Sequence, residues 1–569
     1  MTWSLDTSRN DESSKCRWLL VPYMTGRLYD VGCGAYKVFL HATGVDSGKA
    51  WGRATADIHV ETAERLDFAA SQTVDCVFSS HLLEHLDDWK GALREWLRVL
   101  RTGGHLCLYL PHRDFYPQIG DRRKWREWFA LNGGRFKSND EAVEAYVQPR
   151  RDAGETRTGY IYADTPWGNT DHKQDFAPQD IIDAMREIGG VDLVDNEDRN
   201  DDDEYSFWQV WERLPNKREF AESWKKPRPA KTAAVTRFGA QGDNIQASSV
   251  LPWLKENGFH VTFFCQAGLG HEVIKHDPNI DRLIVLERDA IPNQFLAEFW
   301  EFERKRYTKW INLCESIEGT LLAAPGRSNF NWPNAARALH MDRNYLEWTH
   351  ALAEVPPPYR PKFYSTLEER AWARKTADRW GRRNILWSLA GSSGHKVWPH
   401  LDAVIAGLML EYPDVHVVLV GDEACRILEV GWEKEPRVHC QSGKWTIRES
   451  MSFAEVADII IGTETGLLNA AGSMDAWKIV TLSHSSQEML TKHWKNVIAL
   501  EQPEGVGCPK HPCRQLHGGE GHDQWEDCPP HEDDEMKVAL CQYHVSADMM
   551  FAAIQRVFGV PVAIQRRAA

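Results

Sequence analysis

Short apolar runs with strand character alternate with longer amphipathic segments along most of this 569-residue chain. In the first part of the chain, strand-like runs lie at 26–32, 73–80 and 103–111. Helix-like segments, with apolar positions three and four residues apart, lie at 91–101 and 177–189. Apolar strands separated by helices are typical of a parallel sheet that helices cover on both faces. The pattern therefore predicts α/β architecture.

The alternation is interrupted at 215–230, where the chain is polar, contains prolines and shows no apolar periodicity. Such a composition indicates a domain boundary. Strand-like runs resume at 231–239 and 260–268, and again at 382–391 and 457–466. A chain of this length is also too long for one hydrophobic core. We therefore predict a tail at 1–16, a first domain at 17–214, a linker at 215–230, and two further lobes at 231–380 and 381–569.

The formal net charge of −15 argues against unaided binding of nucleic acid, because an acidic surface repels phosphate backbones. The first residues lack the basic stretch followed by an apolar stretch that marks a secretory signal peptide. No apolar run reaches the roughly 18 residues that are needed to span a bilayer. These features predict a cytoplasmic enzyme without a transmembrane segment.

A glycine turn follows the first strand-like run. Asp30, Gly32 and Gly34 form an Asp-x-Gly-x-Gly pattern, in which glycine lets the backbone approach a ligand closely. About a dozen residues later, Asp46 ends the next strand, where a carboxylate can accept hydrogen bonds from a ribose diol. By itself the Gly-x-Gly turn is also compatible with a plain tight turn.

Residues 75–111, with VDCVFSSHLLEHLDDW and GGHLCLYLP, resemble the fourth and fifth strands of class I S-adenosylmethionine-dependent methyltransferases, and the resemblance extends over 17–214. It implies a Rossmann-like domain that binds S-adenosylmethionine. The implied contacts are Asp30, Gly32 and Gly34 around the methionine part, Asp46 on the ribose, and Leu66 and Phe68 near the adenine. Thr62 stands where many relatives have an acidic residue.

Three histidines lie at the predicted carboxyl ends of two strands, where open α/β sheets bind ligands: His81, His85 and His112. A histidine there could deprotonate a hydroxyl for O-methylation, or it could cap a loop or pack against it. The chain has neither Asp/Asn-Pro-Pro-Tyr nor Pro-Cys after the fourth strand, which disfavours methylation of DNA bases. Residues 121–170 could form a lid over the acceptor or a solvated insertion.

The second part opens with a strand that runs into Gly239-Ala240-Gln241-Gly242-Asp243 and then a helix. From position alone, Asp243 could be a general base or a helix N-cap. The pieces RFGAQGDNIQASSVLPWLK, LAGSSGHKVWPH and ADIIIGTETGLLNAAGS resemble the heptosyltransferases of glycosyltransferase family 9 over 231–558. This resemblance implies a GT-B fold of two Rossmann-like lobes, the first for the acceptor and the second for a nucleotide-diphosphate sugar.

The same resemblance implies roles for particular residues. Asp243 would deprotonate the acceptor hydroxyl in an inverting displacement, and Lys396 would face the diphosphate. Thr465 and Gly466 fit diphosphate contact through a hydroxyl and a backbone N–H. Glu464 and Asn469 stand where the family has Asp and His, so the donor could differ from an ADP-linked heptose.

Four late cysteines form a further cluster: Cys508, Cys513, Cys528 and Cys541. Thiolates can hold zinc, but structural zinc sites favour ligand pairs with two to four residues between them, and here the gaps are four, fourteen and twelve residues. Zinc binding and a loop of free thiols therefore both stay open. We expect the helix after this cluster to cross back to the first glycosyltransferase lobe.

Together these features predict a bifunctional transferase that adds a sugar and a methyl group to a glycan, lipid-linked or small-molecule acceptor. Two other hypotheses remain open. The sugar could be attached to hydroxymethylated bases of DNA, or one domain could be degenerate and act as a binding or assembly module.

Overall fold

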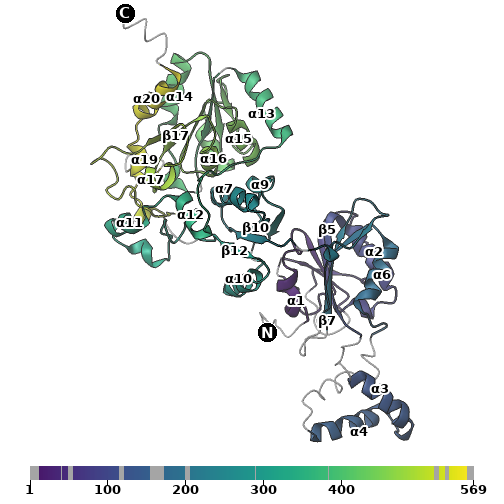
Figure 1. Cartoon of the computed structure of the whole chain (residues 1–569). Helices are drawn as coiled ribbons and strands as arrows, with labels where there is room; N and C mark the ends of the chain where they lie inside the picture. Colours follow the sequence, from purple (N-terminus) through teal and green to yellow (C-terminus); the bar gives the residue numbers. More distant parts are fainter. Residues whose placement is uncertain are drawn as a thin grey trace, which may run out of the picture. The chain divides into compact units, whose positions relative to one another are not determined.

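A computed structural model describes residues 12–39, 41–48, 56–113, 121–153, 172–198, 206–227, 229–268, 270–288, 290–381, 383–391, 393–517, 524–531 and 537–559. The chain forms two compact units (Figure 1). The first contains Met1–Arg228 together with Ile284–Glu303, and the second contains Pro229–Leu283 and Arg304–Ala569. The break between them at 228/229 falls inside the predicted linker.

The first unit is built on an eight-stranded sheet in the order β3-β2-β1-β4-β5-β7-β6-β8. Strands β1 to β5 are parallel, and β7 is antiparallel to both β5 and β6. Their bounds are β1 Leu28–Val31, β2 Thr43–Asp46, β3 Ile58–His59, β4 Val74–Ser80, β5 Leu100–Pro111, β6 Val191–Asp198, β7 Ser206–Arg213 and β8 Phe220–Ala221. The carboxyl ends of β1, β2, β4 and β5 therefore lie along one edge of the sheet.

Helices α2 (Trp89–Val99) and α6 (Pro178–Ile188) pack on this sheet because each buries one apolar stripe. Their buried residues include Leu93, Trp96 and Ile181, which share one core with residues of β1, β4 and β5. Two further helices, α3 (Asp121–Asn132) and α4 (Asn139–Asp152), belong to the region predicted as a lid or an insertion.

The predicted boundaries differ from the structure at three places. Helix α1 (Glu12–Leu20) begins inside the predicted tail, and β8 places part of the predicted linker in the first sheet beside β6. The segment Ile284–Glu303, which contains most of helix α10 (Leu296–Arg304), belongs to the first unit. Within that unit, the Trp18 ring lies 5.9 Å from the ring of Phe295.

The second unit contains most of the first predicted lobe and the whole of the second, and each lobe has its own sheet. In the first sheet β9 is parallel to β10 and β12, and in the second every neighbouring pair of strands is parallel. The first lobe has the order β11-β10-β9-β12, and the second has the order β15-β14-β13-β16-β17-β18. The bounds in the first lobe are β9 Thr232–Thr236, β10 His260–Gln266, β11 Arg282–Leu286 and β12 Lys309–Asn312. Those in the second lobe are β13 Arg383–Ser388, β14 Val415–Val420, β15 Val438–Cys440, β16 Ile459–Gly462, β17 Trp477–Thr481 and β18 Val497–Leu500. The α/β fold class and the two-lobed architecture are thus confirmed.

Helix α7 (Gln241–Ser248) of the first lobe packs against α16 (Gly466–Ala471) of the second. A Cβ atom added to Gly466 would lie 2.9 Å from Cβ of Gln241 and 3.1 Å from N of Gly242. The two loops approach this closely because both carry glycine at the contact.

The last helix, α20 (Ala547–Phe558), packs against α14 (Leu401–Glu411) and β17, and Met550 and Ile554 are buried in the core of the second lobe. The expectation that this helix crosses back to the first lobe is therefore wrong, because its apolar stripe completes the second lobe. In the described part of the chain, no helix is long and apolar enough to span a bilayer.

Candidate functional site

The glycine turn after β1 has the backbone that a ligand loop needs. Gly32 and Gly34 have φ angles of +81° and +55°, a region that favours glycine. A Cβ atom on Gly32 would lie 2.7 Å from the Leu82 side chain, so packing also requires glycine there. Among the residues that the structure describes, apart from the two chain neighbours, no atom lies within 4 Å of a Cβ position built on Gly34, which leaves open space beside that residue.

Two carboxylates shape this turn. Asp30 is buried, and the Val38 N–H donates to its Oδ2 at 2.6 Å. The Gly34 N–H donates to Asp46 Oδ2 at 3.0 Å, and the Gly48 N–H donates to Oδ1 at 2.8 Å. A carboxylate has about four lone-pair positions, so Asp46 keeps acceptor capacity for a ribose diol. The turn and its carboxylates fit a bound S-adenosylmethionine, which would supply an electrophilic methyl group there.

The two residues predicted near the adenine differ in exposure. Leu66 is fully buried in the core, whereas Phe68 is 40% exposed and its ring lies 5.6 Å from that of Tyr29. Of the two, only Phe68 has exposed surface against which an adenine ring could pack.

The histidines predicted after β4 lie around a carboxylate. His81 follows β4 with a φ of +47°, and η1 (Leu83–His85) comes next. Glu84 is completely buried, and burial raises its pKa to about 8. Burial also lowers the pKa of His81 to about 4. His112 lies apart from this group in sequence, buried beside Phe207 at the end of β5.

His172 is a member of the group that the sequence did not indicate. The rings of His85 and His172 meet edge to face, with centroids 4.7 Å apart. The N–H of Lys173 donates to the carbonyl of Glu84 at 2.8 Å, which holds the segment of His172 against η1. Only long-range docking brings this residue to β4, so no local pattern could have predicted it.

In the second unit, Asp243 lies in the first turn of α7. The Ala240 N–H donates to Asp243 Oδ2 at 2.8 Å, and Arg237 Nη2 lies 3.0 Å from Oδ1. Arg237 is buried and also pairs with Glu318. The N-cap of α7 is Ala240 and not Asp243, which stands three residues later and accepts from the N–H of that N-cap, while its side chain keeps 23% exposure.

Lys396 is buried in η6 (Gly394–Lys396), and its Nζ donates to the carbonyl oxygen of Glu464 at 3.1 Å. Burial lowers the pKa of Lys396, while the charges of Glu464 and Asp243 act in the opposite direction. The predicted phosphate ligand therefore lies beside Glu464 at the start of α16, the helix against which α7 packs.

The Glu464 side chain binds the chain's own backbone. The N–H groups of Ser483 and Ser485 donate to Oε1 at 3.0 and 2.9 Å. The Ser483 hydroxyl donates to Oε2, and His484 Nδ1 lies 3.0 Å from that oxygen. This carboxylate fixes the loop at 483–485.

The other predicted donor-binding residues surround the start of α16. Thr465 is its N-cap, and its hydroxyl accepts from the N–H of Leu468. Asn469 Oδ1 accepts from Gln246 Nε2 at 3.0 Å, a hydrogen bond that joins the two lobes. Gly466 lies at the close contact with α7.

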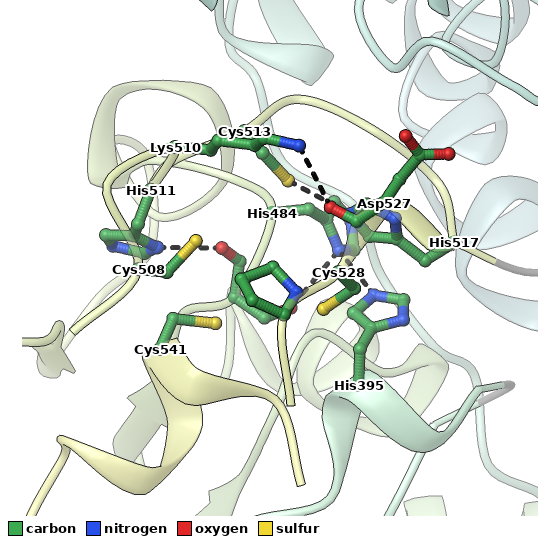
Figure 2. A pocket seen from close by; sticks show the side chains of 12 residues that line it. His395, His484, Cys508, Lys510, His511, Cys513, His517, Asp527, Cys528 and Cys541 are labelled. Carbon is green, nitrogen blue, oxygen red and sulfur yellow. Dashed lines mark hydrogen bonds between the residues drawn. The ribbon is translucent and has the colours of Figure 1, made fainter. Parts of the chain in front are cut away.

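The four late cysteines are buried free thiols that line one cavity of about 20 Å³ (Figure 2). Its other lining residues include His395, His484, His511 and His517. Burial and the neighbouring thiols Cys513 and Cys508 raise the pKa of Cys528 to about 12. The structure therefore gathers cysteines that are distant in sequence, with histidines beside them.

Residues 27–108 match the family model described as a methyltransferase domain. The match covers the glycine turn, Asp46 and the Glu84 region. None of the curated proteins compared with the chain matches it.

Solved structures similar to the chain include a glycosyl transferase of family 9 from Veillonella parvula, with 16% identity over 48% of this chain and 86% of that one and a TM-score of 0.37. Another is the E. coli ADP-heptose lps heptosyltransferase II, with 12% identity, 57% and 98% coverage and a TM-score of 0.41. A SAM-dependent methyltransferase from Thermotoga maritima has 16% identity, 35% and 93% coverage and a TM-score of 0.22. The match at 27–108 agrees with the methyltransferase resemblance named from the sequence.

Proposed function

We propose that the first unit transfers a methyl group from S-adenosylmethionine to a hydroxyl of its acceptor. The observation that carries this half is the glycine turn with Asp46 bonded to Gly34 and Gly48, inside the segment that matches a methyltransferase domain. The open space beside Gly34 supports a ligand at this turn. Histidines near the carboxyl end of β4 provide nitrogen atoms that would take part in removing the proton of a hydroxyl acceptor.

We further propose that the second unit transfers a sugar from a nucleotide diphosphate to a hydroxyl of a glycan, lipid-linked or small-molecule acceptor. Asp243 would take the proton of the acceptor hydroxyl. The oxygen would then bond to the anomeric carbon while the bond to the diphosphate breaks on the opposite face, which inverts the configuration. Lys396, with Thr465 and Gly466, would stabilise the departing diphosphate. The packing of α7, which carries Asp243, against α16, whose N-cap is Thr465, supports this arrangement, and Lys396 Nζ donates to the carbonyl of the preceding residue, Glu464.

Calorimetry with S-adenosylhomocysteine and with a panel of nucleotide diphosphates tests both halves on the full chain. We expect one ligand of each kind to bind. Absence of nucleotide binding would refute the sugar-transfer half and leave that unit as a binding or assembly module. Mass spectrometry with labelled methyl donor, mixed nucleotide sugars and candidate acceptors then identifies the acceptor, and transfer to duplex DNA would favour hydroxymethylated bases.

Asp243→Asn tests the proposed base. The amide can still accept from the Ala240 N–H, so we expect donor binding to persist while sugar transfer is lost. Asp281→Asn is a suitable control, because Asp281 has similar exposure (27% against 23%) and pairs with a surface lysine of the same lobe. If Asp243→Asn transfers sugar at the same rate as the Asp281→Asn control, Asp243 is not the base and only stabilises the start of its helix.

For the four late cysteines we propose a structural metal, zinc being the ion that thiolates and imidazoles favour. Their convergence on one cavity supports this. Metal analysis of the purified protein, beside a Cys513→Ser variant, tests it: the variant should lose one equivalent of metal. Equal metal content in both proteins would leave the cluster as a loop of free thiols.

A further inference from the structure

Glu84 is a buried carboxylate whose surroundings do not match a purely structural role. Its side chain has no exposed surface, and in the described part of the chain neither carboxylate oxygen has a hydrogen-bond partner. Burying an unpaired polar group costs about 1–3 kcal/mol, more when it is charged. A buried polar group without a partner is therefore a candidate for binding an ion or another ligand.

Imidazole nitrogens surround one oxygen of this carboxylate. His81 Nδ1 and His85 Nε2 each lie 3.8 Å from Glu84 Oε1, and His172 Nε2 lies 4.0 Å from it. These distances are too long for hydrogen bonds. Two ligands at about 2.1 Å from a tetrahedral ion lie about 3.4 Å apart. Ligand atoms of Glu84, His85 and His172 all lie within 4.8 Å of one another, which is wider than that spacing, so small side-chain rotations would close them around an ion.

The outer ring nitrogens of two histidines have polar partners. His172 Nδ1 lies 3.3 Å from Asp175 Oδ1, and His81 Nε2 lies 2.9 Å from the Ser206 hydroxyl. Metal-binding histidines usually hold a carboxylate or another polar group on the nitrogen that does not face the ion, because this fixes their tautomer and orientation. His172 with Asp175 has this arrangement.

We propose that Glu84, His85 and His172 bind a divalent transition-metal ion of the zinc or iron(II) class, with His81 beside it. Two imidazoles and one carboxylate suit such ions better than magnesium or calcium, which prefer oxygen ligands. Three protein ligands leave coordination positions open. His85 and His81 are 23% and 15% exposed, so a ligand can reach the ion from solvent.

The ion would hold the acceptor, and this part rests on the proposed methyl transfer. Glu84 and His85 follow β4 at the same sheet edge as the glycine turn that follows β1. A hydroxyl bound to a divalent cation loses its proton more readily. The proton passes to water, the oxygen bonds to the methyl carbon, and the carbon–sulfur bond breaks with its electron pair left on sulfur. An acceptor with a hydroxyl able to bind the metal is therefore expected.

Cobalt(II) binding to chelator-treated full-length protein tests the site without any turnover. A site of nitrogen and oxygen ligands gives ligand-field bands without thiolate-to-metal charge transfer, so it is distinct from the cysteine cluster. We expect Glu84→Gln and His172→Ala to lose these bands and one equivalent of metal, and Asp175→Asn to bind about 10- to 100-fold more weakly. The exposed residues Glu61 and His59 provide controls of the same chemistry, Glu61→Gln and His59→Ala, which should bind as the parent does.

Equal binding by the parent and Glu84→Gln, or a spectrum with thiolate bands alone, would overturn the proposal. Thermal melting of each variant identifies any variant that has lost its fold. Asp175→Asn tests the metal site independently, because it weakens cobalt binding without changing Glu84. If cobalt binds but S-adenosylhomocysteine does not, the metal site stands and the methyl-transfer proposal fails. If both bind, removal of the metal should abolish methylation while S-adenosylhomocysteine binding persists.

Discussion

Glu464 has two possible roles: it could bind the nucleotide-sugar donor, or it could hold the loop at 483–485 in place. Replacing Glu464 by Ala distinguishes between them. The substitution removes the acceptor for the N–H groups of Ser483 and Ser485, which are both buried. Each buried donor left without a partner costs about 1–3 kcal/mol, so the two together cost about 2–6 kcal/mol. Glu464→Gln keeps an amide oxygen for both N–H groups and should cost only about 1–2 kcal/mol.

Hydrogen exchange measured by mass spectrometry on peptides that cover 478–490 is the appropriate assay, because a chain of two units does not unfold in one step. We expect faster exchange in Glu464→Ala, a smaller change in Glu464→Gln, and none in Glu423→Ala, whose carboxylate is 72% exposed in the same lobe. Unchanged exchange in Glu464→Ala together with weaker nucleotide binding would refute the anchoring role and favour the donor ligand that the resemblance implies.

Three further predictions concern the turn, the lobe contact and a buried acid. Asp46→Ala should weaken binding of S-adenosylhomocysteine about tenfold or more in calorimetry, since two loop N–H groups lose their acceptor; unchanged affinity would contradict this role of Asp46. Gly466→Ala should destabilise the packing of α7 on α16 by about 1–3 kcal/mol and slow sugar transfer. Unchanged hydrogen exchange in peptides that cover 241–248 would count against the close contact. Burial raises the pKa of Asp277 to about 6, so the folded state favours the protonated acid and loses stability as pH rises through that value. Asp277→Asn should therefore gain stability relative to the parent by about 3 kcal/mol between about pH 4 and pH 8 in urea unfolding, and a pH-independent difference would refute the shift.

The architecture and the location of both glycine-bearing turns were predictable from the sequence. Apolar periodicity gave the α/β class, because burial of a strand or helix face depends on neighbouring positions in the chain. The glycines at 32 and 34 were also predictable, since a tight turn after a strand requires a backbone that other residues rarely adopt. The family match at 27–108 agrees with that part of the interpretation.

Which side chains meet depended on contacts between segments that are distant in sequence. It brought His172 to Glu84 and turned the Glu464 carboxylate toward 483–485, and it placed α20 on the second lobe. It also added β8 to the first sheet from a segment that is polar in sequence. The physical reason is the same in each case: a polar or apolar group is satisfied by partners far along the chain, and local sequence carries no record of which partner folding brings.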